Sequence, residues 1–102
     1  MTNISNQPTF FQGLGTKFQI VPNLLSANVS GTTIILDAKK GEYYELNEVG
    51  TFIWEQLKSN KKTIEELKEL VLNEFEVEES IVFSDLNNIL NEFVKEKFVE
   101  IS

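Results

Sequence analysis

The hydrophobic pattern of this chain changes its period at Asn47, and that change limits the folds open to it. Before Asn47, residues 17–46 form short runs rich in β-branched and aromatic residues, separated by turn signals. After it, apolar residues recur every three or four positions, as they do on one face of a helix. A strand-rich first half followed by a helix-rich second half predicts an α+β fold.

The first half predicts a small antiparallel meander. Ser30-Gly31 is a turn signal, and Gly41 closes a second loop after two lysines. Pro22 ends the first strand because it has no backbone N–H. We expect the strands at 17–21, 24–29, 32–36 and 42–46.

The second half predicts three helices. Asn47 is a favourable N-cap for the first, and Thr63 with Glu66 forms a capping box at the start of the second. The third runs from about residue 78 to 97 and is followed by a short extended piece at 98–101. Apolar residues share one face of each of the first two helices: Val49, Phe52, Ile53 and Leu57, with Trp54 beside them, and then Ile64, Leu67, Leu70, Val71 and Phe75.

Three missing residue types exclude most catalytic chemistry. The sequence has no Cys, no His and no Arg, so it offers no thiolate metal site, no imidazole base and no guanidinium clamp. We therefore expect no enzyme activity, no metal and no cofactor. The net charge of −7 disfavours nucleic acid as a partner. No apolar run approaches the ~20 residues of a membrane span, and the N-terminus lacks the features of a signal peptide, so we expect a cytoplasmic protein without a membrane partner.

The third helix carries two adjacent apolar rows. Together they span about 140° of the helix, whereas packing on a core needs only ~100°. Either both rows are buried, or the second row lines a cleft beside the sheet. The first row is Val82, Leu86, Ile89 and Phe93, and the second is Phe83, Leu90 and Val94.

The strand at Glu42–Leu46 is short, ends at a helix cap, and fits the edge of the sheet. An edge strand exposes unpaired backbone donors and acceptors, to which an extended peptide adds as a further strand. Tyr43 and Tyr44 point to opposite faces, so one contacts the core and the other the cleft or solvent. The sequence thus predicts a peptide-binding module.

Residues 1–16 are predicted to be a flexible N-terminal arm before a domain at 17–102. The arm is rich in polar residues and Gly, but it contains the aromatic pair Phe10 and Phe11. The pair either docks on the domain's own core, covers the cleft, or meets a second copy in a homodimer.

The central residues resemble a known family. Leu46-Asn47-x-x-Gly50-x-x-Ile53-Trp54, preceded by Lys40-Gly41-Glu42-Tyr43-Tyr44-Glu45, is similar to the signature of PqqD proteins, and the resemblance extends from about Leu24 to Ile101. Such proteins are recognition elements for ribosomally synthesised, post-translationally modified peptides. The sequence departs from that pattern at Lys97, where the family commonly has Gly at the end of the last helix.

The resemblance implies a winged-helix-like fold, with a three-stranded antiparallel β-meander packed on three α-helices. It also implies that the leader segment of a precursor peptide binds as an added strand and is presented to a separate maturation enzyme, such as a protease, a cyclase or a radical SAM enzyme. Lasso-type or radical-modified peptides are favoured over PQQ itself. Carried over by position, the peptide-binding residues are Glu42, Tyr43, Tyr44, Glu45, Leu46, Phe83, Asn87, Leu90 and Val94. The acids Glu42, Glu45 and Asp85 either attract basic residues of the leader or are solvated surface acids, and for each one taken singly the surface role is favoured.

Two alternatives stay open from the sequence. A winged-helix DNA-binding protein shares the same outline but needs a basic helix face, which none of the predicted helices has. A purely dimerising module would pair its edge strand and Phe10–Phe11 across a two-fold axis, and a peptide would compete for that edge.

Overall fold

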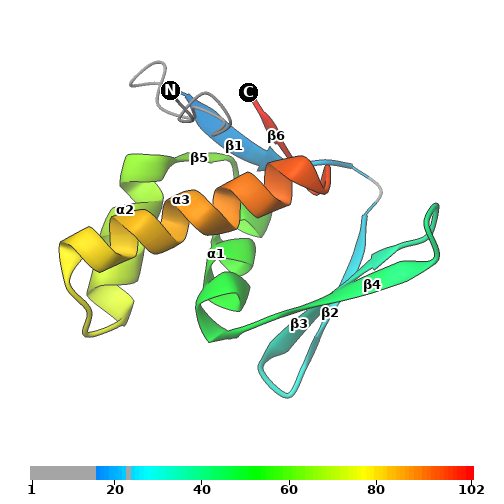
Figure 1. Ribbon diagram of the computed structural model, residues 1–102, viewed down its shortest axis with the longest axis horizontal. Coiled ribbons are helices and arrows are strands. Elements are labelled where there is room, and N and C mark those ends of the chain that lie inside the picture. The colour runs from blue at the N-terminus through cyan, green and yellow to red at the C-terminus, as the bar shows by residue number, and fades with distance from the viewer. Residues whose placement is uncertain (1–15, 23) are drawn as a thin grey trace, which may run out of the picture.

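The computed structural model of the chain describes residues 16–22 and 24–102. Phe10, Phe11 and nearly all of the predicted arm lie outside the described residues. Within these residues the chain forms three helices and six short strands (Figure 1). In order they are β1 (Lys17–Ile20), β2 (Leu25–Val29), β3 (Thr32–Asp37), β4 (Glu42–Leu46), α1 (Glu48–Ser59), β5 (Lys62–Thr63), α2 (Ile64–Glu74), α3 (Glu79–Lys95) and β6 (Val99–Ile101).

The strands form two sheets. β2, β3 and β4 are the predicted antiparallel meander, which projects beyond the helices in Figure 1. The prediction that residues 17–21 belong to the same meander is wrong, because β1 lies between β5 and β6 in a second sheet. Pro22 ends β1 before it reaches β2, and the chain returning from α3 brings Val99 opposite Ile20. The extended piece predicted near the C-terminus is confirmed as β6.

The predicted helix starts are confirmed by their caps. The side chain of Asn47 accepts a hydrogen bond from the backbone N–H of Gly50 at 2.8 Å. Thr63 and Glu66 form the reciprocal capping box, with the Thr63 N–H donating to Glu66 Oε1 at 2.8 Å and the Glu66 N–H donating to Thr63 Oγ1 at 3.1 Å. These contacts satisfy amide groups that the first turn of a helix leaves free, and so they fix where α1 and α2 begin.

Trp54 connects the two halves of the fold. It is 1% exposed, and its ring lies edge-to-face against Phe93 of α3 with the ring centroids 5.5 Å apart. Its indole N–H donates to Ser26 Oγ in β2 at 3.2 Å. The meander is therefore held to the helices by both apolar packing and a side-chain hydrogen bond.

Lys97, two residues after the end of α3, has a backbone conformation that favours glycine. Its φ angle is +66°, and its N–H donates to the carbonyl of Val94 at 3.0 Å. A left-handed backbone costs a residue with a Cβ about 1–2 kcal/mol. The position where PqqD-like sequences commonly have Gly is thus the left-handed residue that directly follows the C-cap Glu96.

We expect Lys97→Gly to raise the free energy of unfolding by about 1 kcal/mol, because Gly adopts this conformation without steric cost. Urea denaturation monitored by circular dichroism measures the change. Lys97→Ala is the matched control: it removes the same charge but keeps a Cβ, so it should give no gain. Equal gains in both variants would contradict the backbone explanation.

Candidate functional site

β4 is an edge strand. β3 pairs with it on one side, and no strand of the described residues pairs with it on the other. Gly41, Glu42, Tyr43 and Tyr44 line an open hollow beside it. The edge therefore offers unpaired backbone groups next to free space.

The hairpin geometry identifies which groups of β4 are unpaired. Ser30 and Gly31 both have positive φ angles, +56° and +86°, as in a type I′ turn, which makes Val29 and Thr32 a hydrogen-bonded pair. Successive residues of β3 turn their backbone groups alternately to β2 and to β4. The β3 residues that turn to β4 are therefore the ones paired with Glu42, Tyr44 and Leu46. It follows that Tyr43 and Glu45 turn their N–H and C=O groups to the free side.

A threonine of α1 holds the end of β4 in place. The Thr33 N–H donates to Thr51 Oγ1 at 3.1 Å, and the Thr51 hydroxyl lies 3.4 Å from the carbonyl oxygen of Leu46, to which it donates. Thr51 is buried, so these bonds are shielded from water. They fix β4 relative to the helix that follows it.

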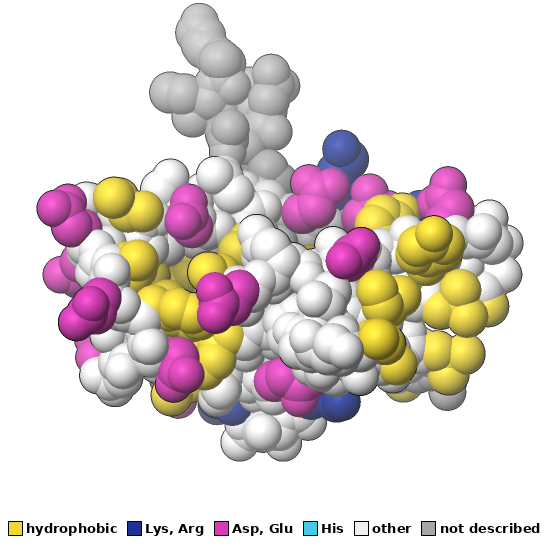
Figure 2. All heavy atoms as spheres, turned by 90° about the horizontal axis from the view of Figure 1, so that it is seen from below, with side chains coloured by type: hydrophobic (Ala, Val, Ile, Leu, Met, Phe, Trp, Pro, Cys, Tyr) yellow, Lys and Arg dark blue, Asp and Glu magenta, His cyan; other side chains and the backbone are white. Residues whose placement is uncertain are grey.

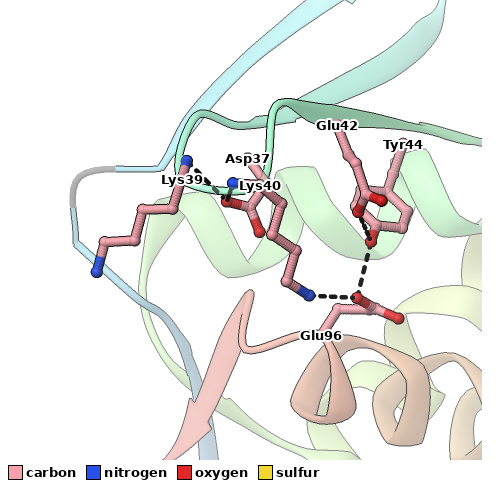
Figure 3. A network of polar contacts seen from close by, with 6 residues as sticks. All are labelled: Asp37, Lys39, Lys40, Glu42, Tyr44 and Glu96. Atoms are coloured by element: carbon pink, nitrogen blue, oxygen red, sulfur yellow. Dashed lines mark hydrogen bonds and ion pairs between the residues drawn. The ribbon is translucent and has the colours of Figure 1, made fainter.

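At its other end, β4 is tied to the residue after α3 (Figure 3). The Tyr44 hydroxyl donates to Glu96 Oε1 at 2.8 Å and lies 3.1 Å from Glu42 Oε1. Lys40 Nζ lies 3.4 Å from the same oxygen of Glu96. The Tyr44 ring also packs edge-to-face on Phe98, with the centroids 4.8 Å apart. These contacts set the spacing between the strand and the helix at this end.

This network shifts two pKa values in opposite directions. The hydrogen bond to Glu96, followed by burial and by the nearby Glu42, raises the pKa of Tyr44 above its usual value of 10.0. The same hydrogen bond, followed by the one from Lys40, lowers the pKa of Glu96 below its usual 4.5. Both shifts favour a neutral tyrosine beside an ionised carboxylate.

Tyr44→Phe should therefore lower the free energy of unfolding most between about pH 5 and pH 10. A raised tyrosine pKa stabilises the fold below pH 10.0, and this contribution is lost as the pH rises further. A lowered glutamate pKa stabilises it above pH 4.5, and this contribution is lost as the pH falls. Urea denaturation of both proteins across this range measures the difference. A difference independent of pH would contradict the network, and Tyr43→Phe, at an exposed position, is the control without effect.

An apolar pocket of about 50 Å³ lies near the other end of β4. Val49 of α1, which follows β4 by three residues, forms part of its wall. The rest comes from α2, α3 and the segment between them: Val71, Phe75, Val77, Val82, Asp85 and Leu86. Asp85 is the one charged residue in this lining.

One row of residues on α3 and its cap runs from the pocket to the contact with Tyr44. The sheet-side row is Val82, Asp85, Ile89 and Glu96. The first three lie on one side of α3 because they are three and four positions apart, and Glu96, the C-cap, continues the same side. Its first two members line the pocket beside Val49, and its last contacts Tyr44. We call the surface between this row and the free edge of β4 the β4 groove.

The predicted site residues fall into separate groups. Glu42, Tyr43 and Glu45 are exposed on β4, Tyr44 and Leu46 are half-buried there, and the structure brings all five together. On α3, Leu90 is 0% exposed in the core, and Val94 lines a different hollow with Val21 and residues of β6. Phe83 is 37% exposed, and Asn87 is half-buried, with its side-chain oxygen buried and without a hydrogen-bond partner among the described residues.

The row formed by Phe83, Asn87, Leu90 and Val94 lies about 140° around α3 from the sheet-side row, at ~100° per residue. The structure therefore does not bring Val94 to the pocket side of the helix. Val49 and Ile89 were not among the predicted site residues, because a helical wheel shows which residues share a side but not which side faces the sheet.

The outer face of the meander is apolar. Leu25, Leu36 and Tyr43 lie side by side across its three strands, and all are exposed, Tyr43 at 71%. Hydrophobic side chains gather over this end of the molecule in Figure 2. A strand added to β4 would continue this face, because alternate side chains of a strand point to the same side.

Comparisons with known proteins give one family model and two similar solved structures. The family model described as coenzyme PQQ synthesis protein D (PqqD) matches residues 32–99. The solved structure of TbiB1 in complex with the TbiA(beta) leader peptide is 27% identical with a TM-score of 0.73, covering 80% of this chain and 94% of that one. A lasso peptide synthetase B1 complexed with the leader peptide is 20% identical with a TM-score of 0.71, covering 81% and 96%. No curated protein matches the chain.

These similarities confirm the predicted fold class, a three-stranded antiparallel meander with three helices. The second small sheet is an addition to that prediction. In the described part of the chain, no helix has the length and apolar character needed to cross a membrane.

Proposed function

Because the chain belongs to the family of coenzyme PQQ synthesis protein D, we propose that it is a non-catalytic domain that captures the leader segment of a ribosomal precursor peptide. The leader would add to β4 as a further strand. The observation that carries this proposal is the free edge of β4, whose outward backbone groups at Tyr43 and Glu45 lie beside the β4 groove. The two similar solved structures, each with a bound leader peptide, support the same role.

Affinity would come mainly from backbone hydrogen bonds and a few side-chain anchors. Alternate side chains of the added strand would enter the β4 groove, and the others would extend the apolar outer face beside Tyr43. We assign the helical wall of the groove to the sheet-side row. Peptide binding by Phe83, Asn87 and Val94, on the other row of α3, stays a separate prediction. Leu90 is buried and packs in the core.

Capture of the leader would serve a separate maturation enzyme. The sequence contains no Cys, His or Arg, and the described residues include no cluster of three side chains suited to a metal ion. We therefore infer that a protease, a cyclase or a radical SAM enzyme does the chemistry, and that this domain raises the local concentration of its substrate. This work would take place in the cytoplasm, where precursor peptides are made.

Titration of the isotope-labelled protein tests the proposal. The probes are the TbiA(beta) leader peptide and 16-residue peptides selected from a random display library. We expect saturable amide shifts at Tyr43, Glu45, Val49 and Asp85. Binding without shifts at these residues would move the site elsewhere, and shifts confined to Phe83, Asn87 and Val94 would favour the other row of α3.

The same experiment separates the two alternatives. A winged-helix DNA-binding protein would show shifts on adding a DNA duplex, which the acidic surface disfavours. A homodimer paired through β4 would show concentration-dependent shifts at Tyr43 and Glu45 before any peptide is added, and a peptide would then dissociate it.

A further inference from the structure

The net charge of the chain lies entirely in one segment. Residues 69–94 contain seven acidic residues and no lysine, whereas the remaining residues contain nine acids and nine lysines. The segment comprises most of α2, the connection to α3, and most of α3. Its acids are Glu69, Glu74, Glu76, Glu78, Glu79, Asp85 and Glu92.

Lys68 neutralises only one of these acids. Its Nζ lies 2.8 Å from Glu79 Oε2 and 3.2 Å from Glu65 Oε1. Among the described residues, the other six acids of the segment form no ion pair. The local field is therefore negative and uncompensated.

The apolar pocket lies within this acidic segment. Asp85 is part of its lining, while Glu76 and Glu78 flank the lining residue Val77. Glu48 stands next to Val49 on the α1 side of the pocket, and like the other three it is exposed. Figure 2 shows an apolar hollow ringed by acidic side chains at the helical end of the molecule.

We propose that the peptide taken by the β4 groove is basic and inserts one large apolar side chain into this pocket. This inference rests on the proposed function and adds the class of peptide. The apolar lining selects a Leu, Ile, Met or Phe side chain, because a polar group there would lose its water without gaining a partner. The surrounding acids select Lys or Arg on both sides of that anchor and repel acidic peptides.

A random library of 16-residue peptides displayed on phage tests the class directly. Peptides selected on the native protein should be enriched in Lys and Arg, depleted in Asp and Glu, and share one large apolar position. Replacing that position by Ala should weaken binding about tenfold, as expected for a buried anchor. Acidic or uncharged peptides as the main outcome would overturn the inference.

A charge-reversal pair tests the position. Asp85→Lys should weaken binding of the selected peptide about tenfold at low salt and much less at 0.5 M salt, because the screening length between exposed charges falls to roughly 4 Å at that salt concentration. Glu100→Lys changes the net charge equally but lies on β6, away from the pocket, and should change binding less than about twofold. Equal effects of the two variants would overturn the inference. If the lysine variant does not fold, Asp85→Asn replaces it in the same test. It should weaken binding less than Asp85→Lys, and this weakening should also diminish at 0.5 M salt.

Failure of the inference and failure of the proposed function give different results. If selected peptides shift the amides of Tyr43 and Glu45 but are not basic, strand addition stands and the peptide class is wrong. If basic peptides bind near Asp85 and leave Tyr43 and Glu45 unchanged, the pocket is a site but the strand addition is wrong.

Discussion

Replacing Tyr43 by proline should weaken peptide binding about 100-fold and leave the fold intact. Tyr43 directs its backbone N–H to the free side of β4, so proline removes a bond to the peptide and keeps the ladder to β3. The peptide carbonyl that would accept from the Tyr43 N–H then has no donor and lies against the proline ring instead. A combined loss of about 2–3 kcal/mol corresponds to this change in Kd. Isothermal titration calorimetry measures it.

Tyr43→Thr is the matched control, because it removes the same exposed ring and keeps the N–H. It should weaken binding by at most about tenfold, clearly less than the proline variant, since it loses only the contact of the ring with the outward side chains of the peptide. Circular dichroism must show that both variants are folded, and Glu45→Pro gives a second test at the other outward position. Equal binding by the proline and threonine variants would contradict strand addition at β4.

Trp54→Ala should lower the free energy of unfolding by about 3–5 kcal/mol, as large-to-small changes of buried aromatic residues do. The indole is 1% exposed, packs on Phe93 and Phe98, and donates to Ser26 of β2. Small domains have total stabilities of about 5–15 kcal/mol, so this loss is a large fraction of the whole. Chemical denaturation, at a temperature where the variant is still folded, measures it.

Trp54→Phe separates the packing of Trp54 from its hydrogen bond. It keeps an aromatic ring against Phe93 and loses the donor to Ser26, so a smaller cost of about 1–3 kcal/mol is expected. A cost for Trp54→Ala below about 1 kcal/mol would show that the helices and the meander are not joined through this residue.

Local signals in the sequence predicted most of the fold. The caps at Asn47 and Thr63 depend on side chains within three residues of the backbone groups they bind, so they can be read from the chain directly. The turn at Ser30-Gly31 is local in the same way, and its geometry sets the register of the meander.

The parts that the sequence did not predict depend on contacts between distant segments. β1 pairs with β6, about eighty residues further along the chain, and its own pattern does not distinguish this from pairing with β2. The side of α3 that faces β4 is set by Tyr44 and Glu96, fifty-two residues apart. The pocket likewise needs Val49 to meet residues of α2 and α3.

Hydrogen exchange of individual amides during peptide binding tests the central claim most directly. The meander has two edges, and the alternation that turns the backbone groups of Tyr43 and Glu45 outward on β4 does the same for Ser26 and Asn28 on β2, where no strand of the described residues pairs with them. We predict that a saturating selected peptide slows exchange at Tyr43 and Glu45 and leaves Ser26 and Asn28 unchanged. Slowing at Ser26 and Asn28 alone, or at none of the four while the peptide is bound, would contradict leader capture on β4.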